Sequence, residues 1–382
     1  MNKKSGGAEM EKHLERPIEP KRMNKIRIAK FISSRGVTSK TEISGSLKIS
    51  MPTTLQNVKE LMEAGVVVEE GEYESTGGRK AKALSINQKA GYALGVDITR
   101  NHITTVIVNA RKEILASDRI RVPYRNESDY YEEMIRHIFE FSGKQKIKKE
   151  KIMGIGFSLP GFVNREQKVL TSSHVLKVKN VSFKNLETLL HVPYELDNDA
   201  NSAAFAELGN TAGNEVYLSL SNTVGGAVYF DRKLYRGENF KSGEFGHMII
   251  ERNGRTCYCG KKGCADAYCS ASILQEHGDG SLEGFFDKLR SRQKEATEVW
   301  EEYLEYLAIV ITNLRMFFDC KIVLGGYVGG YLDEFMPDLA KKVMEYNKFD
   351  LDTSYLSTGK YKLEAAAYGA TLGFIEDFLE KV

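Results

Sequence analysis

The feature that most constrains how this chain can fold is a cluster of cysteines in its second half. Three of the five cysteines in the 382 residues, Cys257, Cys259 and Cys264, fall within eight residues, and His247 lies ten residues before the first of them. Three thiolates and one imidazole complete the tetrahedral shell that zinc prefers in structural sites. The spacing therefore predicts a structural Zn²⁺ site, ahead of the alternative of three incidental thiols.

Composition indicates a soluble, multidomain protein. A chain of 382 residues with 42% hydrophobic and 28% charged residues suits two or three globular domains. No apolar run reaches the roughly 18 residues that a membrane span needs, and the polar N-terminus lacks the apolar core of a signal peptide. We therefore expect a cytoplasmic protein without a membrane partner, a setting in which clustered cysteines favour a metal over disulfides.

Charge is distributed unevenly along the chain. Residues 21–62 hold nine Lys and Arg against two Glu, a net charge of +7. The first ninety residues carry 17 basic and 11 acidic groups, or +6, which leaves −4 for the remainder of a chain whose total is +2. This asymmetry predicts a basic module attached to a mildly acidic body.

The basic module has the helix start and stop signals of a helix-turn-helix. Apolar residues recur at helical spacing over 26–32 and stop at Gly36. Ser39 and Glu42 form a capping box that opens a second helix, and Ser50 is a suitable N-cap for a third. Two short helices joined by a tight turn are typical of this DNA-binding motif.

A β-hairpin wing follows, with predicted strands at 66–68 and 83–86. The predicted DNA contacts are Ser50, Thr53, Thr54, Gln56 and Asn57 to base edges, Lys48 and Lys59 to phosphates, and Arg79 and Lys80 of the wing to the minor groove. Winged helices also serve as protein–protein modules, which is the alternative. The basic charge and the polar third helix favour DNA.

The central motif resembles a known family. Glu244-Phe-Gly-His247 followed by Cys-x-Cys-Gly-x-x-Gly-Cys-x-Asp at 257–266 resembles the ROK family, which groups repressors, open reading frames and sugar kinases. The resemblance implies an α/β, actin-like, two-lobed sugar-kinase-like body in which the zinc loop supports a sugar site. His247 would bind zinc through one nitrogen and face the sugar with the other. The family's motif ends in Glu, whereas this chain has Asp266, one methylene shorter.

The same resemblance, with the charge and motif boundaries, divides the chain into five expected segments. These are a flexible N-terminus (1–20), a winged helix-turn-helix DNA-binding domain (21–88), an N-lobe (89–200), a C-lobe with the zinc loop (201–362) and a C-terminal helix returning to the N-lobe (363–382).

A sugar site is implied by the segment Asn198-Asp199-Ala-Asn201, which resembles the family's Asn-Asp-Ala-Asn motif. In the family's kinases this Asp is the general base on a sugar hydroxyl, which requires direct hydrogen-bond reach. Asp199 would alternatively serve as a helix N-cap. The full set of implied sugar contacts is Asn198, Asp199, Glu244, His247, Asp266, Gly161 and Ser173.

The nucleotide side departs from the family's kinases. Where they carry Asp-x-Gly-x-Thr, this chain has Asp97-Ile-Thr-Arg100-Asn101, without the glycine that admits phosphates. The second phosphate loop retains only Gly225 and Gly226, and it reads equally well as a plain β-hairpin turn.

These observations favour a DNA-binding transcriptional regulator, a repressor of carbohydrate-metabolism genes, over an enzyme. Its operator affinity would be modulated by a small sugar bound between the lobes. Family analogy adds a homodimer or tetramer. The alternatives are an ATP-dependent sugar kinase with an added DNA-binding domain, and a structural zinc protein that binds partners.

Overall fold

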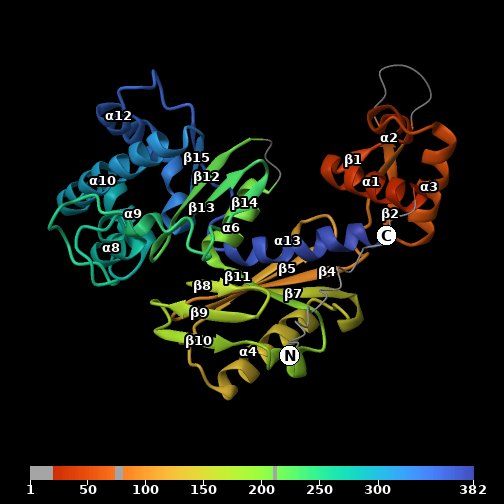
Figure 1. The fold of residues 1–382 in the computed structure, drawn as a ribbon, viewed down its shortest axis with the longest axis horizontal. Coiled ribbons are helices and arrows are strands. Elements are labelled where there is room, and N and C mark those ends of the chain that lie inside the picture. Colours follow the sequence, from red (N-terminus) through yellow and green to blue (C-terminus); the bar gives the residue numbers. More distant parts are fainter. Residues whose placement is uncertain (1–19, 74–80, 210–212) are drawn as a thin grey trace, which may run out of the picture. The chain divides into compact units, whose positions relative to one another are not determined.

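The computed structural model describes residues 20–73, 81–209 and 213–382 (Figure 1). The chain separates into two compact units, which we call the head and the body. The head extends to Asn87 and includes Phe378–Val382, and the body is Gln88–Asp377. Among the described residues, no helix has the length and apolar character needed to cross a bilayer.

Between residues 20 and 87, the described part of the head contains three helices and a small sheet. Its elements are α1 (Pro20–Arg35), β1 (Val37–Thr38), α2 (Lys40–Leu47), α3 (Met51–Glu63), β2 (Val67–Tyr73) and β3 (Ala81–Ile86). The predicted caps are confirmed: Ser39 Oγ accepts from the backbone N–H of Glu42 at 3.2 Å, and Ser50 Oγ from that of Thr53 at 3.3 Å. Both predicted wing strands form, paired antiparallel, and the unpredicted β1 adds to β3 in the order β1-β3-β2.

The first half of the body is built on a five-stranded sheet in the order β11-β7-β4-β5-β6. Its elements are β4 (Tyr92–Ile98), β5 (Ile103–Asn109), β6 (Ile114–Ile120), α4 (Ser128–Lys144), β7 (Ile152–Leu159), α5 (Leu186–Leu190) and β11 (Tyr194–Asn198), with a 3-10 turn at Lys149–Lys151. A side sheet joins β8 (Phe162–Asn164), β9 (Val169–Ser173) and β10 (Val178–Ser182).

The second half has a sheet in the order β14-β13-β12-β15-β16. Its elements are α6 (Asp199–Leu208), β12 (Glu215–Leu220), β13 (Val224–Phe230), β14 (Lys233–Tyr235), α7 (Asp266–Cys269), α8 (Ala271–His277), α9 (Leu282–Arg290), α10 (Lys294–Phe318), β15 (Lys321–Gly325), α11 (Gly326–Gly329), α12 (Met336–Tyr346), β16 (Leu356–Thr358) and α13 (Ala365–Glu380), with 3-10 turns at Phe245–His247 and Leu332–Phe335.

The two large sheets have the same topology. In each, the first three strands form an antiparallel meander, the fourth pairs in parallel with the first, and the fifth pairs in parallel with the fourth. Two copies of this unit in one chain define the actin-like, two-lobed fold that the sequence predicted. Residues at the ends of the parallel strands are thereby brought to the cleft between the lobes.

Helix α13 covers one face of the N-lobe sheet, where it runs along β4 and β7 (Figure 1). A Cβ on Gly95 would lie 1.8 Å from the carbonyl oxygen of Ala367, and one on Gly156 would lie 2.0 Å from that of Ala370. These glycines allow the helix to approach the strands closely, so the terminal segment is part of the body's core.

Candidate functional site

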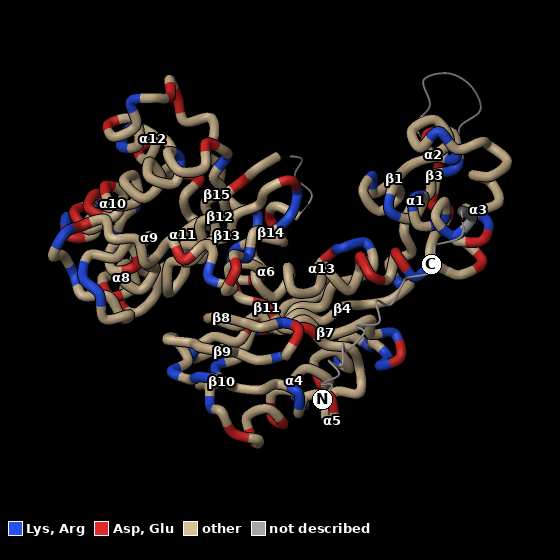
Figure 2. Tube along the Cα trace, viewed as in Figure 1, with Lys and Arg blue, Asp and Glu red and all other residues tan. Residues whose placement is uncertain are grey.

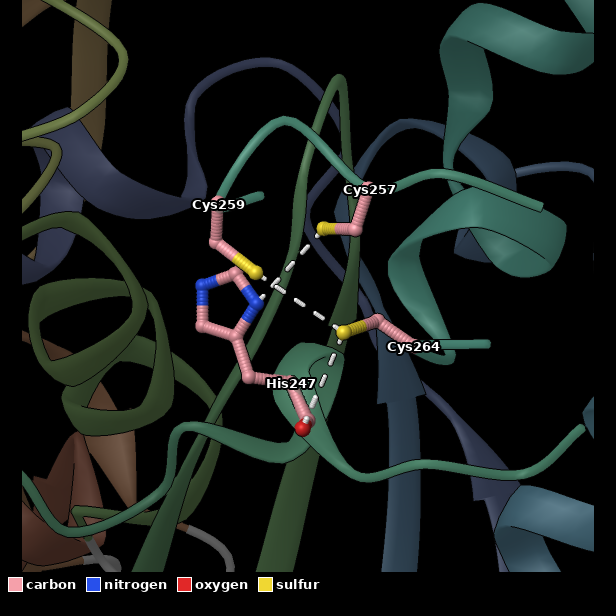
Figure 3. A group of neighbouring side chains, drawn as sticks. All are labelled: His247, Cys257, Cys259 and Cys264. Atoms are coloured by element: carbon pink, nitrogen blue, oxygen red, sulfur yellow. Dashed lines mark hydrogen bonds between the residues drawn. The ribbon is translucent and has the colours of Figure 1, made fainter. Parts of the chain in front are cut away.

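Four ligand-type side chains converge in the loop that follows the second sheet's meander (Figure 3). One donor atom from each of His247, Cys257, Cys259 and Cys264 lies within 4.8 Å of every other. The Sγ atoms of Cys259 and Cys264 are 3.8 Å apart, and Cys257 Sγ is 3.8 Å from His247 Nδ1. A tetrahedral zinc ion with Zn–S bonds of about 2.3 Å would place its ligand atoms about 3.8 Å apart. The donor set therefore fits a closed metal site.

His247 has a different environment at each ring nitrogen. Nδ1 faces the cysteines, whereas Nε2 lies 3.2 Å from the Tyr258 hydroxyl and 3.8 Å from a carboxylate oxygen of Glu244. Burial, and secondarily the charge of Lys261, lower the pKa of His247. The ring is thus neutral at neutral pH, which is the form that ligates metals.

A cavity of ≈ 230 Å³ lies directly beside this cluster. Six of the seven predicted sugar residues line it, namely Gly161, Ser173, Asn198, Asp199, Glu244 and His247. Its volume is below the about 300–1,000 Å³ typical of drug-sized pockets, so it suits a small ligand. Carboxylates, an amide and an imidazole around one cavity form a set of partners for hydroxyl groups.

Asn198 and Asp199 are held by the start of α6. Asn198 is the N-cap: its Oδ1 accepts from the Asn201 N–H at 3.0 Å, and its Nδ2 donates to the Gly161 carbonyl at 3.0 Å. The alternative that Asp199 caps the helix is therefore wrong, because the residue before it does so. Asp199 is left as the first helical residue, with Oδ1 accepting from the Ala200 N–H at 2.9 Å.

The cavity raises the pKa values of its acids. Burial raises the pKa of Asp199 to about 6. Burial, followed by the charge of Asp199, raises the pKa of Glu244 to about 7. Desolvated carboxyl groups of this kind form strong hydrogen bonds with a ligand, since a polar ligand restores the partners that water would supply.

Asp266 does not lie on the cavity wall, contrary to the sequence prediction. Its side chain is buried, and Oδ1 accepts the backbone N–H of Val224 at 2.6 Å. Burial raises the pKa of Asp266 to about 6. The shorter side chain thus holds the turn before Gly225 and Gly226 in place, and it contacts backbone instead of a ligand.

Two hairpins occupy the positions of the candidate phosphate loops. Thr99 to His102 form a tight turn in which the Thr99 N–H donates to the His102 carbonyl at 2.9 Å. Gly225 and Gly226 lie in β13, directly after the turn that joins this strand to β12, and both line the cavity. Gly226 is required by packing, because a Cβ there would lie 2.3 Å from the Phe245 ring.

A pair of side chains from opposite lobes also lies on this side. The guanidinium carbon of Arg119, on β6, is 5.5 Å from the centre of the Tyr327 ring, on α11. Asp97 is buried nearby and accepts from Ser158 Oγ at 3.0 Å. Burial, followed by the charge of Asp199, raises the pKa of Asp97 to about 7, and Arg119 opposes that shift. A half-buried cation thus lies close enough to the buried acid to oppose the rise of its pKa.

The head's predicted DNA contacts divide into three groups. Ser50, Gln56, Lys48 and Lys59 are exposed, and Thr53 is half-buried. Thr54 and Asn57 are buried, with 0% and 2% of their surface exposed, and do not reach the outer face of α3. Arg79 and Lys80 fall outside the described residues.

Sequence reasoning missed two features of the site. Tyr258 lies between two of the cysteines and lines the cavity, and its position inside the motif was the available signal. The Arg119–Tyr327 contact joins segments far apart in the chain, so no local pattern indicated it.

Fold and site together define a two-lobed, sugar-kinase-like body with a ligand-sized cavity, a metal-ligand cluster and an attached winged-helix head. Residues 93–376 match the profile of the ROK family, which is 284 of the 382 residues. The chain belongs to the ROK family.

Relatives and solved structures extend this result. The chain is 25% identical to the xylose repressor of Caldicellulosiruptor bescii, a match that covers 94% of this chain and 97% of the relative. A ROK family transcriptional regulator, described as a homologue of the E. coli MLC protein, superposes with a TM-score of 0.73 over 94% of this chain and 96% of its own, at 21% identity. A ROK glucokinase from Streptomyces griseus superposes with a TM-score of 0.59 at 21% identity, over 98% of its own length but only 74% of this chain.

Proposed function

We propose that this protein is a DNA-binding transcriptional regulator, a repressor of carbohydrate-metabolism genes, whose operator affinity depends on a small sugar in the cavity. The observation that carries the proposal is the combination in one chain of a winged-helix head with a sugar-type cavity, in a body whose first hairpin turn lacks the glycine of the kinases' phosphate loop. Relatives named as repressors, matched over nearly their whole length, support it. The cytoplasm is the compartment where such a protein meets DNA.

The sugar contacts in this proposal are Asn198, Asp199, Glu244 and His247, with Gly161 and Ser173 shaping the wall. Gly161 has φ of +124°, and a Cβ there would lie 2.3 Å from the Ser172 carbonyl oxygen. Any side chain at 161 would therefore displace the wall. Neutral hydroxyls satisfy these half-buried acids, whereas an analogue that lacks one hydroxyl leaves an acid unpaired, which gives selectivity.

The cluster holds a structural zinc ion in this proposal, with His247, Cys257, Cys259 and Cys264 as ligands. Zinc would supply a cross-link that fixes the loop and orients His247 toward the cavity. Because the same imidazole faces Tyr258 and Glu244 through its other nitrogen, the metal site is coupled to the ligand site.

The response to sugar follows from the two-lobed arrangement. A ligand that contacts both lobes binds the closed state more tightly than the open state, and it therefore favours the closed state. In a dimer or tetramer, that closure alters the spacing of the DNA-binding heads. Within the proposal Arg79 and Lys80 contact the minor groove, and Ser50, Gln56, Lys48 and Lys59 the major groove and its phosphates.

The competing function is an ATP-dependent sugar kinase, and one assay separates the two. The purified chain is incubated with Mg-ATP and a panel of hexoses and pentoses, and ADP release is followed by a coupled assay. The proposal expects no sugar-dependent turnover. Sustained turnover that Asp199→Asn abolishes would make Asp199 a catalytic base and overturn the proposal.

A second comparison tests the positive claim. Asp199→Ala is expected to retain operator binding while losing its response to sugar, because residue 199 lies in the body and not in the head. Arg79→Ala is expected to show the reverse, with weakened DNA binding and intact sugar binding by calorimetry. If both variants lost both properties, the assignment of separate DNA and sugar sites would fail.

A further inference from the structure

The outer face of α3 is more apolar than the sequence pattern suggested. Thr54, Asn57, Val58 and Leu61 form the inner face and are buried. On the opposite side, 37% of the surface of Met51 and 46% of that of Leu55 are exposed. These two residues are four apart, so they lie one turn apart on the same side of the helix.

The polar side chains of α3 are largely engaged within the head. Thr53 Oγ1 lies 2.8 Å from Ser50 Oγ, which also caps the helix. Gln56 Nε2 donates to Glu60 at 2.9 Å, and Asn57 Nδ2 donates to the Thr53 carbonyl at 2.7 Å. The side chains that face outward without such hydrogen bonds are therefore chiefly Met51 and Leu55.

The charge around this face indicates its occupant. Lys48 is the C-cap of α2, three residues before α3, and Lys59 follows Leu55 by one helical turn; both side chains are exposed. Figure 2 shows Lys and Arg positions along the helices of the head. Residues 21–62 carry nine basic and two acidic side chains. A polyanion such as DNA complements this positive charge. The apolar pair also lies on α3, the second helix of the helix-turn-helix, which is the helix that such motifs place in the major groove. An acidic or apolar protein partner would not account for this position.

We infer that Met51 and Leu55 read thymine methyl groups in the major groove. The inference rests on the proposed function and identifies the bases that its operator must contain. Thymine alone among the four bases presents a C5-methyl group in that groove, and apolar side chains recognise it by contact. Four residues of helix rise about 6 Å, so the two thymines lie within about two base-pair steps in each half-site.

The test starts from duplexes that the full chain selects from a random pool, with zinc present. Each thymine in the selected site is then replaced by deoxyuridine, which removes only the methyl group. For the wild-type protein, replacement at one or two positions is expected to weaken binding by about 4-fold each, the value for one buried methyl group. For Leu55→Ala, replacement at one of these positions should have no further effect, while a position read by Met51 should keep its dependence on the methyl group.

Two controls make the result specific. Leu115 is equally exposed, at 47%, but lies on β6 of the body, so Leu115→Ala should bind thymine and uracil duplexes as the wild type does. Lys59→Ala should weaken binding to both duplexes alike and reduce the salt dependence, as expected for a phosphate contact.

Failure of the inference is distinguishable from failure of the proposed function. If no sequence is selected from the pool, the proposed function fails. If a site is selected but wild-type binding ignores every uracil replacement, or Leu55→Ala keeps the full methyl dependence, the inference is wrong while the function stands. A Leu55→Ala variant with unaltered DNA binding and a changed oligomeric state would instead make this face a protein contact, and would equally overturn the inference.

Discussion

Replacing Asp97 by Asn is expected to stabilise the protein at neutral and alkaline pH. Asp97 is buried with 5% of its surface exposed, accepts one hydrogen bond from Ser158 Oγ, and lies close enough to Asp199 for their charges to repel. Asparagine has the same shape and can still accept from Ser158. The substitution therefore removes a buried charge while retaining the packing.

The magnitude follows from the pKa of Asp97. Burial and Asp199 raise it to about 7, above the unfolded value of about 3.9. Between these two values the folded state binds more protons than the unfolded state, so the free energy of unfolding falls as pH rises through this window. At about 1.4 kcal/mol per pKa unit, the gain for Asp97→Asn is at most about 4 kcal/mol near pH 8 and about 1.5 kcal/mol near pH 5. Both figures already include the opposing attraction of Arg119, because the pKa of about 7 is the net result of all these causes.

Urea unfolding followed by far-ultraviolet circular dichroism at both pH values measures this difference. Asp338→Asn, which removes an exposed carboxylate on α12, should change stability by no more than about 0.5 kcal/mol at either pH. The reasoning is refuted if Asp97→Asn is no more stable than the wild type near pH 8, or if its gain is the same at both pH values.

Three further substitutions test the geometry of the body. Cys264→Ser should lower zinc content, measured by elemental analysis, and destabilise the body because the loop loses its cross-link; unchanged metal content would contradict the ligand assignment. Gly226→Ala should cost about 1–3 kcal/mol in urea unfolding, since its Cβ overlaps the Phe245 ring, and a neutral effect would show that the ring moves freely. Arg236→Ala should lower the free energy of unfolding by about 1–3 kcal/mol, because Arg236 donates to both carboxylate oxygens of the half-buried Asp197 at 2.8 and 2.7 Å. An unchanged unfolding midpoint would show that this ion pair does not stabilise the fold.

Local signals predicted the head well because its helices begin at residues whose side chains cap them. Ser39 and Ser50 form the hydrogen bonds that their positions implied. The two-residue strand β1 was missed, since it is too short for periodicity and exists only by pairing with β3. The burial of Thr54 and Asn57 was readable, because they share helical phase with Val58 and Leu61, but their polar chemistry suggested the surface instead.

In the body, motif spacing brought the right residues to one place but did not fix their roles. The cysteines and His247 converge as their spacing required. Asp266 occupies a motif position, yet its hydrogen-bond partner is the backbone N–H of Val224. Val224 belongs to β13, 42 residues earlier in the chain, so no local sequence pattern could indicate this contact. The Arg119–Tyr327 contact likewise depends on how two lobes close on each other, which only tertiary packing determines.

The most direct test of the central claim is the affinity of the full chain for its selected duplex, measured by fluorescence anisotropy with and without each of a panel of neutral and phosphorylated sugars. The account predicts sequence-specific binding whose dissociation constant one sugar class shifts, and a shift that Asp199→Ala removes without abolishing DNA binding. Absence of specific binding at any salt concentration with zinc present would contradict it.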